Sequence, residues 1–122
     1  MGKFLVIGIA LLLGACASAI SGQSPASRVY AAQADYNVLL SAAVRYVELP
    51  RCEQPAAPTL CSKASVVAEI RKADAAAAAA MTAARDFVRA PGATEAGASK
   101  YLSAALQAIG ALRTILATYG VT

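Results

Sequence analysis

Three apolar stripes with helical spacing constrain the fold of this chain most strongly. The first comprises Val29, Ala32, Tyr36, Leu39, Ala43 and Tyr46, the second Val66, Ile70, Ala73, Ala77, Met81, Ala84 and Phe87 or Val88, and the third Leu102, Ala105, Ile109, Leu112, Leu116 and Tyr119. Apolar residues that recur at alternating threes and fours indicate amphipathic helices. Breaks at Pro50 and at Ala90-Pro91-Gly92 separate the stripes, so we predict an all-α fold, a small antiparallel three-helix bundle over residues 25–122.

Capping residues mark the expected starts of the helices. Ser24-Pro25 has the form of a helix start, with an oxygen cap followed by proline at the first helical position. Ser62 is the expected cap of the second helix, and Thr94 or Ser99 that of the third. If the helices alternate in direction, the first connection lies at one end of the bundle, and the second connection lies at the other end with the residues before the bundle.

The core is expected to be thin. Alanine accounts for 32 of the 122 residues, and its small side chain adds little volume while favouring helix formation. The third stripe is widened by Leu106 and Ile115, and that helix carries only Lys100 and Arg113 as charges. This helix must therefore be well covered, either by the other two helices or in part by a partner or the bilayer.

The N-terminus has the layout of an export signal. Lys3 is followed by residues 4–13, which carry no polar side chain, and then by Gly14, Ala15 and Cys16. The tetrapeptide Leu13-Gly14-Ala15-Cys16 resembles the lipobox of bacterial lipoproteins, in which a diacylglyceryl group is joined to the cysteine sulfur and the chain is cut just before it. The resemblance covers the first sixteen positions and implies a signal peptide at 1–15 and lipidation of Cys16. Residues 17–24 are small or polar, apart from Ile20, and show no periodicity, so we predict a lipidated tether at 16–24.

Two other fates of this N-terminus stay open. An uncleaved transmembrane anchor needs about twenty apolar residues, whereas residues 4–20 offer seventeen at best. Cleavage after Ala17-Ser18-Ala19 would release a soluble periplasmic helical protein. By resemblance to enteric lipoproteins, Ala17 rather than aspartate after the cysteine favours the outer membrane, facing the periplasm.

With Cys16 assigned to acylation, Cys52 and Cys61 form an even pair in an exported protein. Such a pair predicts a disulfide in the first inter-helix loop. Free thiols remain an alternative, and a metal site is disfavoured because the chain has only these two thiols and no histidine. The loop also contains Pro55 and Pro58 and follows Pro50, so it is expected to be stiff. It serves either as a contact surface or merely as a staple between two helices.

The sequence predicts no enzyme, no catalytic residue, no metal and no cofactor. Histidine, the commonest general base, is absent. The seven carboxylates include no pair set among apolar residues, and the chain has neither a Gly-x-Ser-x-Gly elbow nor a glycine-rich phosphate cradle. Once Lys3 is removed, ten basic side chains face seven acidic ones without clustering, which argues against nucleic acid as a partner.

Two classes of function follow. The first is a membrane-anchored envelope lipoprotein that binds or scaffolds a protein partner in the cell envelope. The second is a phage or prophage effector that acts on the envelope in lysis or superinfection exclusion. The segments Leu49-Pro50-Arg51-Cys52 and Leu60-Cys61-Ser62, followed by an alanine-rich helix, are similar to small uncharacterised lipoproteins of proteobacteria and their prophages, and this similarity implies no activity.

Overall fold

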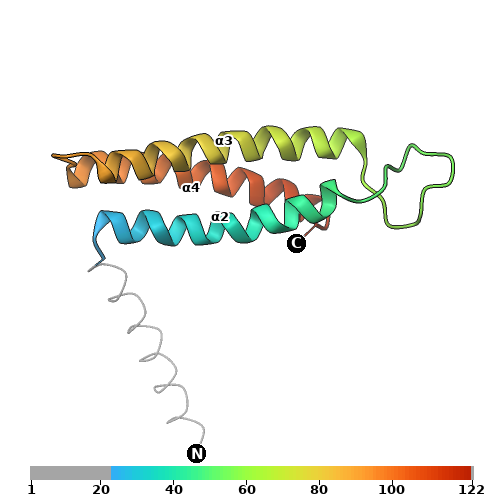
Figure 1. Ribbon diagram of the computed structural model, residues 1–122, viewed down its shortest axis with the longest axis horizontal. Helices are drawn as coiled ribbons and strands as arrows, with labels where there is room; N and C mark the ends of the chain where they lie inside the picture. Colours follow the sequence, from blue (N-terminus) through green and yellow to red (C-terminus); the bar gives the residue numbers. More distant parts are fainter. Residues whose placement is uncertain (1–22, 122) are drawn as a thin grey trace, which may run out of the picture.

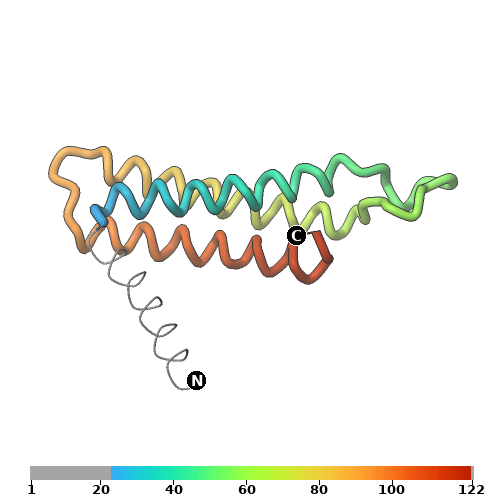
Figure 2. The backbone as a smooth tube through the Cα atoms, turned by 90° about the horizontal axis from the view of Figure 1, so that it is seen from below, coloured from blue at the N-terminus to red at the C-terminus, as the bar shows by residue number. Residues whose placement is uncertain are grey.

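The computed structural model describes residues 23–121 and contains three helices in that part of the chain. Helix α2 spans Pro25–Val47, α3 spans Ala64–Arg89 and α4 spans Glu95–Thr118. The helices run side by side in alternating directions, as the two views in Figure 1 and Figure 2 show. The predicted all-α, antiparallel three-helix bundle is therefore confirmed.

The three stripes form the core where the helices meet. The buried cluster consists of Val29, Ala32, Tyr36, Leu39, Ala43, Val66, Ile70, Ala77, Met81, Ala84, Leu102, Ala105, Ile109, Leu112 and Leu116. Ala73, Val88 and Tyr46 are half-buried and pack against this cluster. Tyr119 differs from the prediction, because α4 ends at Thr118 and Tyr119 follows the helix with 41% of its surface exposed. Most of the third stripe is thus covered by α2 and α3.

The core is thin, as the alanine content predicts. Five members of the buried cluster are alanines, and Ile70, Met81, Leu112 and Leu116 are the bulkiest fully buried side chains in residues 23–121. Tyr36 places its ring in the core, and its hydroxyl donates a hydrogen bond of 2.6 Å to Oδ1 of Asp74. Burial raises the pKa of Tyr36 to about 12, and the hydrogen bond and the negative charge of Asp74 act in the same direction.

Two of the three expected caps are confirmed. The Ser24 hydroxyl accepts a hydrogen bond of 3.2 Å from the backbone N–H of Ser27, and the Thr94 hydroxyl accepts one of 3.1 Å from Gly97. A Cβ atom at Gly97 would overlap with Cζ of Phe87. Glycine therefore allows the ring of Phe87 to lie close to α4.

The bundle has two distinct ends. The end that holds Ser24 and residues 90–94 is called the entry end here, because the described chain enters the bundle there (Figure 1). An ion pair between Arg28 and Glu95 joins the first turns of α2 and α4 at this end. The loop between α2 and α3 lies at the opposite end, called the disulfide end, as expected for helices that alternate in direction. Since α2 has 23 residues, the two ends are about 35 Å apart.

The sequence predictions for the N-terminus fall outside residues 23–121. The signal peptide at 1–15, the lipidated Cys16 and most of the tether at 16–24 belong to this part, and they stay predictions. Within the described residues, no helix combines the length and the apolar character needed to cross a bilayer.

Candidate interaction site at the disulfide loop

Cys52 and Cys61 are joined by a disulfide in the loop between α2 and α3. The bond confirms the pairing expected from the two cysteines, and the alternatives of free thiols or a metal site for this pair are ruled out by it. The Cα atoms of the two residues are 5.0 Å apart. The bond closes the loop at residues 50–61, which we call the disulfide loop.

Backbone hydrogen bonds hold the base of the disulfide loop next to the sulfur bridge. The N–H of Cys52 donates to the carbonyl of Ser62 over 3.0 Å, and the N–H of Ser62 donates to the carbonyl of Pro50 over 2.8 Å. The backbones of Arg51 and Ser62 form an isolated β-bridge between the two arms of the loop. The arms are therefore fixed by main-chain contacts as well as by the covalent bond.

Ser62 does not cap α3 as the sequence suggested. Its side chain is fully buried, and its hydroxyl donates a hydrogen bond of 3.0 Å to the carbonyl of Leu49 at the end of α2. The same oxygen accepts a longer bond of 3.4 Å from Nη1 of Arg51. The N-cap position of α3 is instead occupied by Lys63, whose side chain makes no hydrogen bond to the first turn of the helix. Ser62 thus ties the loop to the preceding helix.

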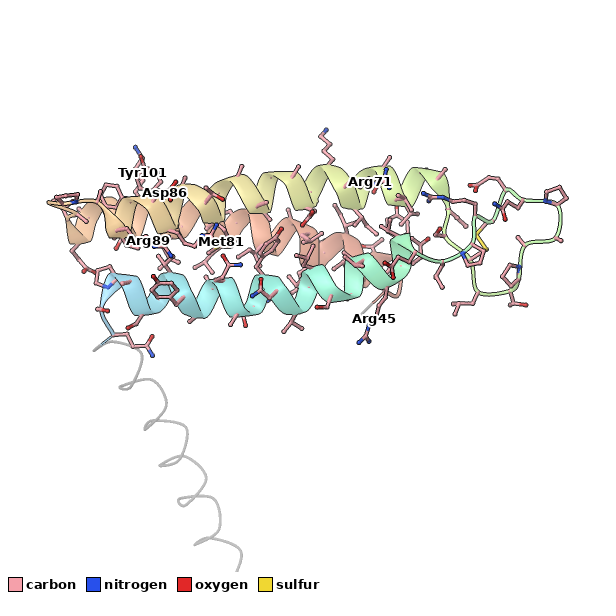
Figure 3. All side chains as sticks on the ribbon, in the orientation of Figure 1. Arg45, Arg71, Met81, Asp86, Arg89 and Tyr101 are labelled. Carbon is pink, nitrogen blue, oxygen red and sulfur yellow. A yellow bond between two sulfur atoms is a disulfide. The ribbon has the colours of Figure 1, made fainter. Side chains whose placement is uncertain are left out.

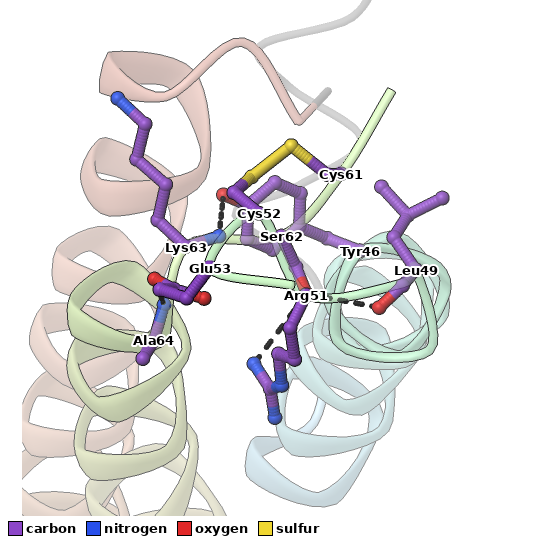
Figure 4. Close-up of a disulfide and its surroundings, with 9 residues drawn as sticks. All are labelled: Tyr46, Leu49, Arg51, Cys52, Glu53, Cys61, Ser62, Lys63 and Ala64. Atoms are coloured by element: carbon purple, nitrogen blue, oxygen red, sulfur yellow. Dashed lines mark hydrogen bonds between the residues drawn. A yellow bond between two sulfur atoms is a disulfide. The ribbon is translucent and has the colours of Figure 1, made fainter. Parts of the chain in front are cut away.

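Two side chains from outside α3 satisfy its first backbone N–H groups, as Figure 4 shows. Oε1 of Glu53 accepts a hydrogen bond of 3.0 Å from the N–H of Ala64, and the hydroxyl of Tyr46 accepts one of 3.1 Å from the N–H of Lys63. The bond from Ala64 is the main cause that lowers the pKa of Glu53, and the positive charges of Arg51 and Lys63 lower it further. An ionised glutamate also suits the positive end of the helix dipole.

A shallow depression of about 440 Å³ lies where the disulfide loop meets the first two turns of α3. It is lined by Arg51, Glu53, Gln54, Ala64, Val67, Ala68 and Arg71. Val67 is only 3% exposed and was not among the predicted core positions. Arg71 belongs to α3 and lies towards the disulfide end (Figure 3). The depression therefore combines apolar carbon with charged groups of both signs.

The rest of the disulfide loop faces solvent. Pro55, Pro58 and Leu60 are exposed, and Leu60 has 70% of its surface in contact with water. Two successive turns order the loop, with hydrogen bonds from Gln54 to Arg51 and from Ala57 to Gln54. The result is a short, crosslinked projection. Its exposed Leu60 lies beside α2 residues such as Ala42 and Tyr46, whereas the charged depression lies between the loop and α3.

The described residues with shifted pKa values are explained by structural contacts. Tyr36 and Glu53 are accounted for above, and the pKa of Tyr119 is raised because its hydroxyl donates to the carboxylate of Glu69 over 3.1 Å. Within residues 23–121, no three His, Cys, Asp or Glu side chains lie together as a metal site. The lipidation site predicted at Cys16 lies outside these residues.

Comparison of the chain with known protein families, with curated proteins and with solved structures finds no match. The function is therefore inferred from the residues and contacts described above.

Proposed function

We propose that this chain is a lipid-anchored protein of the bacterial cell envelope with a non-enzymatic binding or scaffolding role. The observation that carries the proposal is the disulfide between Cys52 and Cys61. Because these two of the three cysteines bond each other, the bundle has no need of Cys16 for a crosslink. Cys16 follows Leu13-Gly14-Ala15 and is the residue that would carry the lipid.

The disulfide also supports an exported location. Disulfides persist in oxidising compartments such as the bacterial periplasm and are rare in the cytosol. A lipid on Cys16 would then hold the bundle at a membrane surface, since acyl chains contribute about 0.8 kcal/mol per buried methylene. Ala17 after the cysteine favours the outer membrane, with the bundle in the periplasm.

We assign the contact with a partner to the disulfide loop. A loop that is already fixed by a crosslink and by backbone bonds loses little conformational freedom when it binds. Leu60 supplies exposed apolar surface on the side of the loop that faces α2, and the depression between the loop and α3 supplies the charges of Arg51, Glu53 and Arg71. These features fit a protein partner in the envelope that offers an apolar surface rimmed by polar groups.

The anchor is tested by metabolic labelling with radioactive palmitate in a bacterium that processes lipoproteins. The unchanged chain and the double variant Cys52→Ser/Cys61→Ser are expected to take up label, whereas Cys16→Ser takes up none and keeps its full length. Mass spectrometry of the mature N-terminus locates the lipid. Label on the Cys16→Ser variant, or an unmodified mature chain that begins at Ile20, would show that the anchor assignment is wrong.

The contact surface is tested with a photoreactive amino acid placed either at Leu60 or at Val38. These side chains have the same exposure of 70%, but Val38 lies on α2, away from the disulfide loop. Irradiation of living cells is expected to give a discrete adduct from position 60 and none from position 38. Equal adducts from both positions, or none from position 60, would refute the assignment of the loop as the contact.

A further inference from the structure

The entry end of the bundle brings together the start of α2, the end of α3 and the start of α4. Arg85, Asp86 and Arg89 lie in the last turns of α3, and Lys100 and Tyr101 lie in the second turn of α4. Figure 3 shows Tyr101, Asp86 and Arg89 at this end. The chain that leads back to Cys16 leaves the bundle at the same end.

The length of that chain limits where the entry end can be. Eight residues, 17–24, separate Cys16 from Pro25. The chain makes nine Cα–Cα steps from Cys16 to Pro25, so at about 3.6 Å per step it spans at most about 32 Å. This reach is shorter than the length of α2, which is about 35 Å. A lipid on Cys16 therefore prevents the bundle from standing on its disulfide end with the entry end pointing directly away from the bilayer, whatever path the eight residues take.

Exposed aromatic side chains occupy this end. Tyr30 on α2 is 49% exposed, and Tyr101 on α4 is 39% exposed. The ring of Tyr101 stacks on that of Phe87, with 4.8 Å between the ring centroids, so its position is fixed. Tyrosine is enriched at the interface between membrane and water, where the ring contacts lipid and the hydroxyl contacts water.

The charges at the entry end favour an anionic surface. Four basic side chains, Arg28, Arg85, Arg89 and Lys100, lie there with two acidic ones, Asp86 and Glu95. Glu95 is already paired with Arg28. Arg89 and Lys100 are exposed, and neither forms an ion pair with another of the described residues. They are available to lipid phosphates.

The distance of Tyr101 from the start of α4 is slightly larger than the thickness of the headgroup layer. Tyr101 is six residues from the start of α4, which places it about 9 Å along the helix axis. The headgroup region of one leaflet is about 5–8 Å thick. The long side chains of tyrosine, arginine and lysine bridge the small difference when the helix ends rest on the membrane.

We propose that the entry end is a membrane-contact surface for the anionic bilayer to which the chain is anchored. Tyr30 and Tyr101 lie at headgroup level, and Arg89 and Lys100 contact lipid phosphates. The bundle then stands on the membrane, with the disulfide loop directed away from it. This inference rests on the proposed lipid anchor, because the lipid holds the entry end at the surface.

The absence of tryptophan from the sequence makes a direct test feasible. Tyr101→Trp and Tyr119→Trp each introduce a single tryptophan, at positions of similar exposure, 39% and 41%, but at opposite ends of α4. Each mature acylated variant is reconstituted into vesicles of phosphatidylcholine and phosphatidylglycerol that contain brominated acyl chains. We expect the emission from position 101 to be blue-shifted and quenched, and the emission from position 119 to be unquenched.

Removal of one positive charge from the entry end tests whether electrostatic attraction contributes to the membrane contact. Lys100→Gln is expected to lower about fivefold the ratio of molecules whose entry end contacts the membrane to those whose entry end does not. This is the factor that follows from losing one basic residue at an anionic membrane surface. Lys72→Gln, an exposed lysine on α3 outside the entry end, is the matched control and should leave quenching at position 101 unchanged. Equal effects of the two variants would overturn the role given to the charges at this end.

Three other outcomes would overturn the proposal. Equal quenching at positions 101 and 119 would show that the bundle lies flat on the membrane, and no quenching at either would show that the entry end does not touch it. A blue shift at position 101 that grows with protein concentration without vesicles would identify a second copy of the chain as the occupant. The mass of the N-terminal peptide, measured on the same sample, separates the proposed membrane contact from the proposed lipid anchor. If the chain is acylated and the tryptophan at position 101 is unquenched, only the membrane contact is refuted. If the chain is not acylated, the anchor is refuted as well.

Discussion

Removal of the disulfide tests how the loop stabilises the bundle. The double variant Cys52→Ser/Cys61→Ser opens a ring of ten residues, since the cysteines are nine positions apart. The chain-entropy relation for a ring of this size gives a stabilisation of about 2.7 kcal/mol. That is a large share of the 5–15 kcal/mol that stabilises a typical domain.

The folded state should survive this change. Ser62 remains buried, with its hydroxyl bonded to the carbonyl of Leu49, and the backbone bonds from Cys52 to Ser62 and from Ser62 to Pro50 do not involve sulfur. Because these bonds fix the base of the loop, the loss of the crosslink acts mainly on the unfolded chain, which gains conformational freedom. We therefore expect unchanged helical content in the folded variant.

Urea unfolding followed by circular dichroism measures the effect. The free energy of unfolding is expected to fall by about 2.7 kcal/mol, and the melting temperature by about 10–20 °C. The reduced form of the unchanged protein should match the variant, and Cys16→Ser, purified in the same way, should match the oxidised protein. A difference below about 0.5 kcal/mol, or a loss of helical signal in the folded variant, would refute this reasoning.

Two further changes address the core. Leu112→Ala removes a fully buried side chain and should lower the free energy of unfolding by about 2–5 kcal/mol. Val38→Ala, at a position that is 70% exposed, should change it by less than about 0.5 kcal/mol. Similar values for the two variants in urea unfolding would contradict the placement of the core. The pKa of Tyr36 is raised from 10.0 to about 12 in the folded state, so its neutral form contributes stability in full below pH 10 and loses that contribution as the pH rises through about 12. The loss amounts to at most about 2–3 kcal/mol, and the Tyr36→Phe variant should not show this pH dependence. If the free energy of unfolding depends on pH in the same way in the variant and in the unchanged protein, this role of Tyr36 is excluded.

The helices could be predicted because their signals are local. The apolar stripes repeat within each segment, and Ser24 and Thr94 lie directly before the turns that they cap. Proline marked the end of the first helix to within a few residues, since α2 ends at Val47 and Pro50 follows. Tyr119 was assigned to the third stripe because its spacing fits, but the helix ends one residue earlier.

The details of the candidate site could not be predicted in the same way. The even number of remaining cysteines was sufficient to predict the disulfide. The hydrogen bond from the N–H of Ala64 to Glu53, however, spans 11 positions, and the one from the N–H of Lys63 to Tyr46 spans 17. No periodicity or capping pattern relates residues at such separations across a loop. Ser62 stands where a cap is expected, yet the disulfide holds it against the end of α2, and its hydroxyl is used there.

The number of helices determines where the disulfide loop lies relative to the start of the bundle. In an antiparallel bundle the first connection is always one helix length from the point of entry, so small errors in helix bounds leave this separation near 35 Å. The second connection, residues 90–94, returns to the entry end, where Ala93 and Thr94 line one depression together with Ser24. If the proposed anchor at Cys16 holds the bundle upright on the membrane, the second connection lies near the bilayer and the first connection about 35 Å further away. The first connection also holds the crosslink and three of the five prolines, Pro50, Pro55 and Pro58. In the proposed orientation, this crosslinked loop is therefore the connection that can reach a partner away from the membrane.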